Sequence, residues 1–346
     1  MYSPIIGISM GDPAGNGAEL TAKSLSKRKV YEKCRPIVIG DAECMKMALK
    51  AIGKEEIQIH AISKVQEAEY CYGTIDVLDM HLVEIGKHQY GKVSKMCGEA
   101  SFQYVKKLIA LAMEKEVDAT VTNAINKEAI NLAGHHYSGH TEIYAHYTGT
   151  SQYAMMLVHE KLRVVHVSTH IALRQACDAV KKDRVLEVIR LADDACRNMG
   201  IVNPKIGIAG LNPHCGENGM FGREEIEEIQ PAIELAMREG ICIPEKKPTP
   251  PDTVFSKALG GWYDIVVVMY HDQGHIPLKV KGFVYNEQAK AWDAVSGVNI
   301  TLGLPIIRTS VDHGTGFGHA GDGSANEISL MNAIDYAVLM AGNQRK

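Results

Sequence analysis

The feature that most limits the fold is an alternation of short, almost continuously apolar runs with amphipathic stretches. Such apolar runs are typical of strands that helices cover on both faces, as in mostly parallel sheets. The sequence therefore predicts an α/β protein, in which ligands bind where strands end. The predicted strands cover Ile5–Ser9, Pro36–Gly40, Ala119–Thr122, Ala154–His159, Arg163–Val167, Lys205–Gly210, Asp264–Met269 and Ile306–Ser310. The predicted helices include Gly17–Lys27, Ala42–Ile52, Glu99–Glu116, Asp183–Met199, Glu224–Arg238 and Asn326–Ala341.

Size, charge and cysteine content narrow the class of protein. The 346 residues suffice for one large or two ordinary domains. The net charge of -4 provides no global attraction for nucleic acid or an acidic membrane surface, so local basic residues must hold any anionic ligand. The eight cysteines form no C-x-x-C pair, which favours a reduced cytoplasm over a disulfide framework. We see no signal peptide and no apolar run long enough for a membrane span.

Polar residues follow the first predicted strand in the segment from Met10 to Glu19. Because this segment opens a helix, its backbone N–H groups are suited to face a ligand. The glycines at 15 and 17 are not followed by the third glycine of the dinucleotide fingerprint. A plain strand-to-helix turn explains the same residues.

Three histidines share one structural context in distant segments. His170, His214 and His271 each lie a few residues beyond an apolar run. If those strands are neighbours in a parallel sheet, three imidazoles converge at one edge and form a divalent-metal site with open positions. Any one of these histidines alone is more often a hydrogen-bonded core or surface residue.

Two further segments are suited to anions and nucleotides. Ser138-Gly139-His140-Thr141-Glu142 precedes a predicted helix, where Thr141 and nearby N–H groups suit a phosphate or carboxylate, although a simple helix cap fits equally. Arg308 near the end of an apolar strand suits a bidentate anion contact, and Lys279 adds a second positive charge. The glycine-rich stretch after Asp312 allows a nucleotide to approach closely, or is only a flexible connection.

Two other functional classes lack their motifs. There is no G-x-x-x-x-G-K-[ST] loop of a P-loop kinase and no G-x-S-x-G elbow of a serine hydrolase.

The segment 282–297 is either part of an active-site lid or an ordinary surface insertion.

Taken together, these blocks resemble the 4-hydroxythreonine-4-phosphate dehydrogenase family of pyridoxal phosphate synthesis, in order from about residue 5 to the C-terminus. The resemblance rests on Gly11-Asp12-Pro13-Ala14-Gly15, Gly139-His140-Thr141-Glu142, Gly210-Leu211-Asn212-Pro213-His214, Pro251-Asp252-Thr253, Met269-Tyr270-His271-Asp272-Gln273-Gly274, Val298-Asn299-Ile300-Thr301-Leu302-Gly303-Leu304-Pro305 and Ile307-Arg308-Thr309-Ser310-Val311-Asp312-His313-Gly314-Thr315.

The resemblance implies an isocitrate/isopropylmalate dehydrogenase-like fold with two α/β domains around a cleft, in a homodimer whose sites are shared between subunits. We expect an NAD-binding domain at 1–125 with 306–346, and a metal-, substrate- and dimer-forming domain at 126–305. It implies NAD and a divalent metal (zinc, or magnesium, manganese or cobalt) as cofactors. The implied metal ligands are His170, His214 and His271; the substrate contacts are His140, Thr141, Lys279, Asn299 and Arg308; and the cofactor residues are Gly11, Asp12, Gly15, His313, Gly314, Thr315 and Gly321.

The family's chemistry is oxidation of a phosphorylated hydroxy acid to a β-keto acid, which loses CO₂. The candidate catalytic residues are Asp252, Asp272 and Lys279, of which the two aspartates are the candidate proton acceptors. The alternative for both carboxylates is structural hydrogen bonding. The family usually has Ile and Pro where this chain has Asn16 and Ala18, and Pro where it has Ala124, which puts the local loop shape in doubt.

Two segments shift the expected substrate. The stretch from Gly274 to Lys279 and the long segment leading into Asn299 look like the catabolic paralogues, which convert 4-phospho-D-threonate or 4-phospho-D-erythronate to dihydroxyacetone phosphate. The rival substrate is 4-phosphohydroxy-L-threonine of vitamin B6 synthesis, which differs at C2. A phosphate-sugar lyase that uses a metal without NAD, and a non-catalytic binding protein, are the more distant alternatives.

Overall fold

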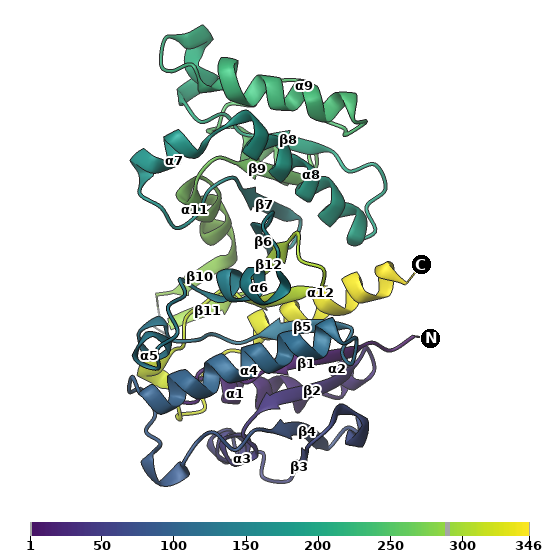
Figure 1. Ribbon diagram of the computed structural model, residues 1–346, viewed down its shortest axis with the longest axis vertical. Coiled ribbons are helices and arrows are strands. Elements are labelled where there is room, and N and C mark those ends of the chain that lie inside the picture. The colour runs from purple at the N-terminus through teal and green to yellow at the C-terminus, as the bar shows by residue number, and fades with distance from the viewer. Residues whose placement is uncertain (1, 288–290, 346) are drawn as a thin grey trace. The chain divides into compact units, whose positions relative to one another are not determined.

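The computed structural model describes residues 2–287 and 291–345, and its chain divides into two compact units. The first unit consists of Met1–Ser151 and Leu304–Lys346, and the second of Gln152–Gly303. Each unit combines strands with covering helices (Figure 1), so the predicted α/β class is confirmed. Within the described part of the chain, no helix is both long and apolar enough to cross a membrane.

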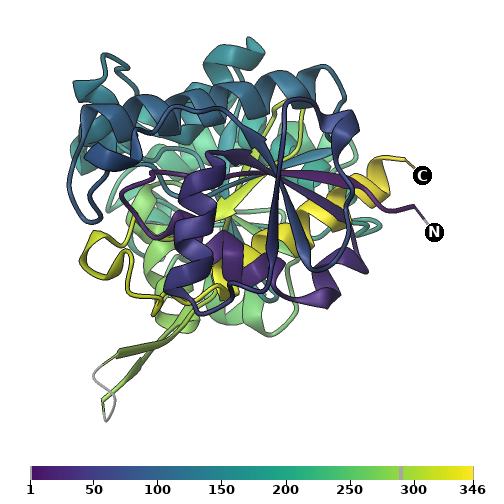
Figure 2. The ribbon, with the colours of Figure 1, turned by 90° about the horizontal axis from the view of Figure 1, so that it is seen from below.

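In the first unit, six strands lie in the order β3-β4-β2-β1-β5-β13, and neighbouring strands pair in parallel. Helix α4 contacts β1, β2 and β5, while α12 packs on β5 and β13; Figure 2 shows these two helices on opposite sides of the fan of strands. This double cover explains why the strands are apolar on both faces. The strands are β1(Ile5–Ser9), β2(Arg35–Gly40), β3(Gln58–Ile62), β4(Thr74–Asp79), β5(Ala119–Thr122) and β13(Arg308–Val311).

The helices of the first unit are α1(Gly17–Leu25), α2(Arg28–Tyr31), α3(Ala42–Ala51), α4(Lys95–Met113), α5(Lys127–Leu132), α6(His140–Thr148) and α12(Ile328–Gln344). Helix α4 begins at the cap Ser94, whose hydroxyl accepts a hydrogen bond from the Cys97 N–H. Short 3₁₀ turns lie at Val65–Glu67, Ile85–Lys87 and Phe317–His319.

Helices α5 and α6 decide where the first unit ends. Ile130 of α5 and Ile143 of α6 pack with Phe102, Val105 and Ile109 of α4 in one buried cluster. This apolar contact joins residues 126–151 to the first unit, whereas the sequence assigned them to the second domain. The chain returns to the first unit at Leu304, and the expected NAD-binding domain resumes at 306.

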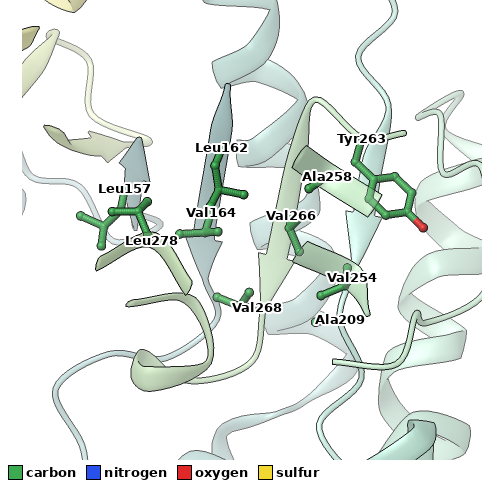
Figure 3. Packing of buried hydrophobic residues seen from close by; sticks show 10 residues of the cluster. All are labelled: Leu157, Leu162, Val164, Ala209, Val254, Ala258, Tyr263, Val266, Val268 and Leu278. Carbon is green, nitrogen blue, oxygen red and sulfur yellow. The ribbon is translucent and has the colours of Figure 1, made fainter. Parts of the chain in front are cut away.

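The second unit contains a mixed sheet in the order β12-β6-β7-β9-β8. Strands β7, β9 and β8 are parallel, and β6 runs antiparallel to both β12 and β7. Side chains from β6, β7, β9, α10 and α11, together with Ala209 and Tyr263, form the core drawn in Figure 3. The strands are β6(Ala154–His159), β7(Leu162–His166), β8(Ile206–Ile208), β9(Ile265–Val268) and β12(Val298–Leu302).

The helices of the second unit are α7(Leu173–Ala179), α8(Lys182–Asn198), α9(Gln230–Arg238), α10(Val254–Leu259) and α11(His271–Gly282). A 3₁₀ segment covers Pro213–Gly219, and a π turn at Glu225–Ile229 leads into α9. Between α11 and β12, strands β10(Phe283–Asn286) and β11(Ala291–Val295) pair as an antiparallel hairpin, so the segment 282–297 contains secondary structure of its own.

Candidate functional site

The three predicted metal-ligating histidines follow three neighbouring parallel strands of the second unit. His170 comes after β7, His271 begins α11 directly beyond β9, and His214 follows β8. The three strands are parallel neighbours, which is the arrangement that the predicted metal site needs. The carboxyl ends of parallel strands lie at one edge of a sheet, so the three histidines follow the same edge.

His170 and His271 are brought together in this unit. Their ring centroids lie 5.7 Å apart, and both rings line a hollow of about 290 Å³ together with Thr169, Tyr270 and Asp272. The Asp272 carboxylate lies 2.6 Å from Nδ1 of His271, which orients that ring.

His214 lies in an unusual turn. Non-glycine residues 214, 215, 217 and 218 all have left-handed backbone angles, with φ of 50°, 59°, 43° and 58°. Nδ1 of His214 lies 3.2 Å from Oε1 of Glu217. Left-handed angles at side-chain-bearing residues cost energy and cluster at functional sites. Among residues 2–287 and 291–345, no three His, Cys, Asp or Glu side chains are close enough to hold a metal ion. The three-histidine site therefore stays a prediction.

Hydrogen bonds link the three histidine-bearing segments to one another. The buried amide of Gln273 accepts from the Met269 N–H at 2.7 Å and donates to the Gly210 carbonyl at 2.7 Å. The Ser168 hydroxyl donates to the Met269 carbonyl at 3.0 Å. These bonds join the segments before His170, His214 and His271.

Sequence reasoning missed two further histidines at this edge. His275 stacks on His271 with ring centroids 3.6 Å apart, and His166 lies 4.8 Å from His275. Burial lowers the pKa of His166 to about 3 and the pKa of His275 to about 4, so both imidazoles are neutral at physiological pH. The four-residue spacing from His271 to His275 on a helix was the available signal for one of them. His166 lies inside a strand and carried none.

In the first unit, Arg308 and His140 form a buried polar pair. Arg308 is 2% exposed, donates from Nη2 to the Thr122 hydroxyl at 2.9 Å, and lies 5.6 Å from the centre of the Tyr144 ring. Burial lowers the pKa of Arg308 to about 10, so it keeps its charge at neutral pH. Burial, and secondly the Arg308 charge, holds the pKa of His140 well below its usual value.

His140 is the first residue of α6, and Thr141 is the second. Nε2 of His140 is buried and has no hydrogen-bond partner in the described part of the chain. A fixed buried cation beside the N-terminal turn of a helix is suited to an anion. The structure therefore places His140, Thr141 and Arg308 in one unit, whereas the expected domain bounds separated Arg308 from the other two.

Lys279 and Asn299, the other expected substrate contacts, belong to the second unit. Nζ of Lys279 on α11 lies 4.3 Å from the centre of the Phe283 ring. Asn299 lies on β12 opposite Leu157 of β6, and its Oδ1 is a buried acceptor. Of the two candidate proton acceptors, Asp272 lines the hollow with His170 and His271, whereas Asp252 lies exposed just before α10.

The expected cofactor residues of the first unit lie in two adjoining loops. The Asn16 N–H donates to the Thr315 carbonyl at 2.9 Å, and a Cβ at Gly15 would lie 2.7 Å from that oxygen. A Cβ at Gly11 would lie 2.7 Å from the Ala124 carbonyl. These glycines are therefore required for close packing of chain segments.

In the loop after β1, the backbone N–H groups of Ala14 and Gly15 donate hydrogen bonds to Asp12 of the same loop. Asp12 is buried, its Oδ1 accepts from the Ala14 N–H at 2.9 Å, and the Gly15 N–H donates to the Asp12 carbonyl at 2.9 Å. Burial raises the pKa of Asp12 to about 6. The bare backbone is found instead at Gly314 and Gly318, where an added Cβ would meet nothing within 4 Å. Without a side chain at these two positions, the backbone there is open to close approach by a ligand.

Comparison with known proteins gives consistent matches. The family model described as pyridoxal phosphate biosynthetic protein PdxA matches residues 32–337. The D-threonate 4-phosphate dehydrogenase of Cupriavidus necator is 44% identical over 334 residues, which cover 96% of each chain.

Two solved structures with the name 4-hydroxythreonine-4-phosphate dehydrogenase also resemble this chain. The one from Klebsiella pneumoniae has a TM-score of 0.86 and 42% identity, and covers 98% of both chains. The one from Burkholderia phymatum has a TM-score of 0.83 and 43% identity, and covers 98% of this chain and 99% of the other.

Proposed function

As a member of the PdxA family, this chain is an oxidoreductase, and we propose that it oxidises and decarboxylates a 4-phosphorylated four-carbon hydroxy acid with NAD. The substrate that we propose is 4-phospho-D-threonate or 4-phospho-D-erythronate, with dihydroxyacetone phosphate as the product. The observation that carries the proposal is the buried, charged Arg308 beside His140 at the start of α6. An anionic substrate group is the natural partner of such a cation.

Identity alone does not separate the two substrates. The Cupriavidus necator relative and the two solved structures lie between 42% and 44% identity, yet they carry names with different substrates. The local sequence from Gly274 to Lys279 favours the threonate branch. His275 from this segment stacks on His271, so the segment contacts one of the proposed metal-ligating histidines. The second candidate is therefore 4-phosphohydroxy-L-threonine dehydrogenase of vitamin B6 synthesis.

The chain's own residues have separate tasks in this proposal. Arg308 and His140 bind an anionic group of the substrate, with Thr141 as a hydroxyl donor, and Lys279 and Asn299 are further substrate contacts. The substrate hydroxyl loses a proton while its carbon loses a hydride. We favour Asp272 over Asp252 as the first proton acceptor, because Asp272 shares a hollow with His170 and His271. NAD, when bound, accepts the hydride.

A divalent metal is expected from the resemblance, with His170, His214 and His271 as proposed ligands and zinc, magnesium, manganese or cobalt as candidates. The spacing of His170 and His271 suits two ligands of one ion, but among the described residues no three His, Cys, Asp or Glu side chains form a group that could hold a metal ion. We therefore assign no chemical step to the metal. For NAD, the bare backbone at Gly314 and Gly318 beside His313 and Thr315 supports binding at this loop.

We also propose a homodimer with shared active sites, in a reducing cytoplasm. All eight cysteines lie in the described part of the chain and are free thiols, as expected for such a compartment. Light scattering of the purified protein tests the dimer, and a monomeric mass at assay concentration would contradict it.

The experiment for the substrate compares two compounds directly. Purified enzyme with NAD and a divalent metal is assayed against 4-phospho-D-threonate and 4-phosphohydroxy-L-threonine, with kcat/KM as the measure. We expect a preference for the threonate of at least about ten-fold, which corresponds to about 1.4 kcal/mol. A preference for 4-phosphohydroxy-L-threonine would contradict the proposed substrate and indicate a role in vitamin B6 synthesis. Absence of NAD reduction with both would overturn the dehydrogenase proposal and favour a lyase.

A further inference from the structure

A buried carboxylate from α1 holds the glycine-rich loop of the first unit. Glu19 is 0% exposed, and it accepts hydrogen bonds from the N–H of Gly321 and, at 2.8 Å, from the N–H of Gly323. Removing a carboxylate from water is costly unless hydrogen bonds replace the lost hydration. Two amides of the loop therefore serve as the partners of Glu19, across more than 300 residues of sequence.

The same face of α1 contacts the chain just beyond these glycines. Lys23 donates from Nζ to the Ala325 carbonyl at 2.6 Å, and Lys27 forms an ion pair with Glu327. Glu19 and Lys23 are four residues apart on one face of α1, whereas Lys27 lies two residues beyond the end of this helix at Leu25. Three points between 321 and 327 are thus attached to α1 and to the residues that directly follow it.

The opposite side of the loop is enclosed as well. A Cβ at Gly321 would lie 2.5 Å from the Tyr90 ring, and a Cβ at Gly323, where φ is +73°, would lie 2.4 Å from the Ala51 carbonyl. A Cβ at Gly91 would lie 2.7 Å from the Phe317 carbonyl. The loop is therefore held between α1, the end of α3 and the segment before α4, in spite of its glycines.

We propose that Glu19 is a positioning residue for dinucleotide binding, acting through the 313–323 backbone. This inference rests on the proposed function, because it takes His313–Thr315 as part of the NAD site. A glycine-rich loop loses much conformational entropy when a ligand orders it. Glu19 orders the loop in the free protein, so binding the dinucleotide does not have to.

The test uses Glu19→Gln, which keeps the size of the side chain but removes its charge and one acceptor oxygen. Lys23→Met, at a partly exposed position, is a second variant that folds even if the first does not. The matched control is Glu43→Gln, since Glu43 is exposed on α3 and forms an ion pair with Lys46 of the same helix. The measurements are the Kd for NADH from its fluorescence, the KM for NAD, kcat, and amide hydrogen exchange over 313–326.

For Glu19→Gln we expect the Kd for NADH and the KM for NAD to rise about ten-fold with kcat within about two-fold, since preorganisation is lost without touching the reacting atoms. Amide exchange in the loop should accelerate, and Lys23→Met should show the same pattern more weakly. An unchanged Kd in both variants, with a wild type that binds NADH, overturns the role of Glu19 alone. A wild type that does not bind NADH overturns the proposed function and this inference with it.

Discussion

Two loops, one in each unit, are each held by a buried glutamate that accepts backbone N–H groups. The loops differ in which of their residues have left-handed backbone angles. In the first unit, buried Glu19 accepts N–H groups of Gly321 and Gly323. In the second unit, buried Glu225 accepts the N–H groups of Leu211 and Asn212, both at 2.7 Å. In each case a buried carboxylate fixes a loop, and that loop carries predicted ligand-binding residues.

The difference lies in which residues carry left-handed angles. In the loop 313–326, positive φ occurs only at glycines 316, 321 and 323, where it costs little. In the loop after β8, four of the five consecutive left-handed residues carry side chains, at a cost of roughly 1–2 kcal/mol for each. The first loop is therefore a relaxed, preformed surface, whereas the second stores strain around His214. Left-handed angles at several residues with side chains are a feature that clusters at functional sites.

The largest effect that separates the two regions is expected for His271→Ala. We expect this variant to lose bound divalent metal and at least about 10³-fold in kcat/KM, while its Kd for NADH stays within about two-fold. Metal analysis of the purified protein and NADH titration check this. His136→Ala is the control, because His136 is exposed and its Nδ1 contacts the exposed Asn131 side chain. Metal retained at full stoichiometry in His271→Ala would contradict the assignment.

Arg308→Ala is expected to impair substrate binding in the first unit and to leave the metal of the second unit in place, the reverse of His271→Ala. Loss of a buried cation that binds a substrate anion should reduce kcat/KM about 10²- to 10³-fold, mostly through KM, and leave bound metal unchanged. Arg308→Lys keeps the charge without the planar fork and should recover only part of the loss. The control Arg190→Ala removes an exposed pair with Glu239. An unchanged KM for the phosphorylated substrate in Arg308→Ala would remove Arg308 from the site.

Glu225→Gln is the counterpart of Glu19→Gln. It weakens the hold on the loop before His214, so we expect about ten-fold weaker metal binding, the usual scale for a residue that supports a metal ligand. The Kd for NADH should not change. Competition with a metal chelator provides the measurement. If both glutamate variants weakened metal and dinucleotide binding equally, the two loops would not be independent.

The smallest effects concern pH and have opposite signs in the two units. The folded-state pKa of Asp12 is raised to about 6, so its contribution to stability is present below about 3.8 and is lost as pH rises through 6. The folded-state pKa of His166 is lowered to about 3, so its contribution is present above 6.5 and is lost as pH falls. Asp12→Asn should therefore stabilise the protein at pH 7, and His166→Gln should flatten the loss at pH 4–6, each by about 1–2 kcal/mol. Urea unfolding across pH 4–8 checks both, and parallel curves for variant and wild type would contradict them.

Strands were predictable where helices cover both faces. β1, β5 and β6 begin and end where the sequence placed them, because each is a buried apolar run. β3 was missed, since it is a partly exposed edge strand, and β4 was missed because its buried Asp76 interrupts the apolar pattern. The segment 282–297 was recognised as an excursion but not as a hairpin.

For the candidate site, the sequence predicts side chains but not what holds them in place. His170, His214 and His271 are predicted from their position after apolar runs, and the strand order β7-β9-β8 agrees with the topology that this prediction assumes. The roles of Glu19, Glu225 and Gln273 depend on contacts between distant segments, for which no local pattern exists. Most predicted cofactor glycines also proved to have a packing requirement of their own.

The most direct test of the central claim is a product balance in one reaction. Purified enzyme is incubated with 4-phospho-D-threonate, NAD and a divalent metal, and NADH, CO₂ and dihydroxyacetone phosphate are quantified together. Oxidation with decarboxylation predicts equal amounts of all three, formed as the substrate disappears. Consumption of the substrate without NADH, or NADH without CO₂, would contradict the account.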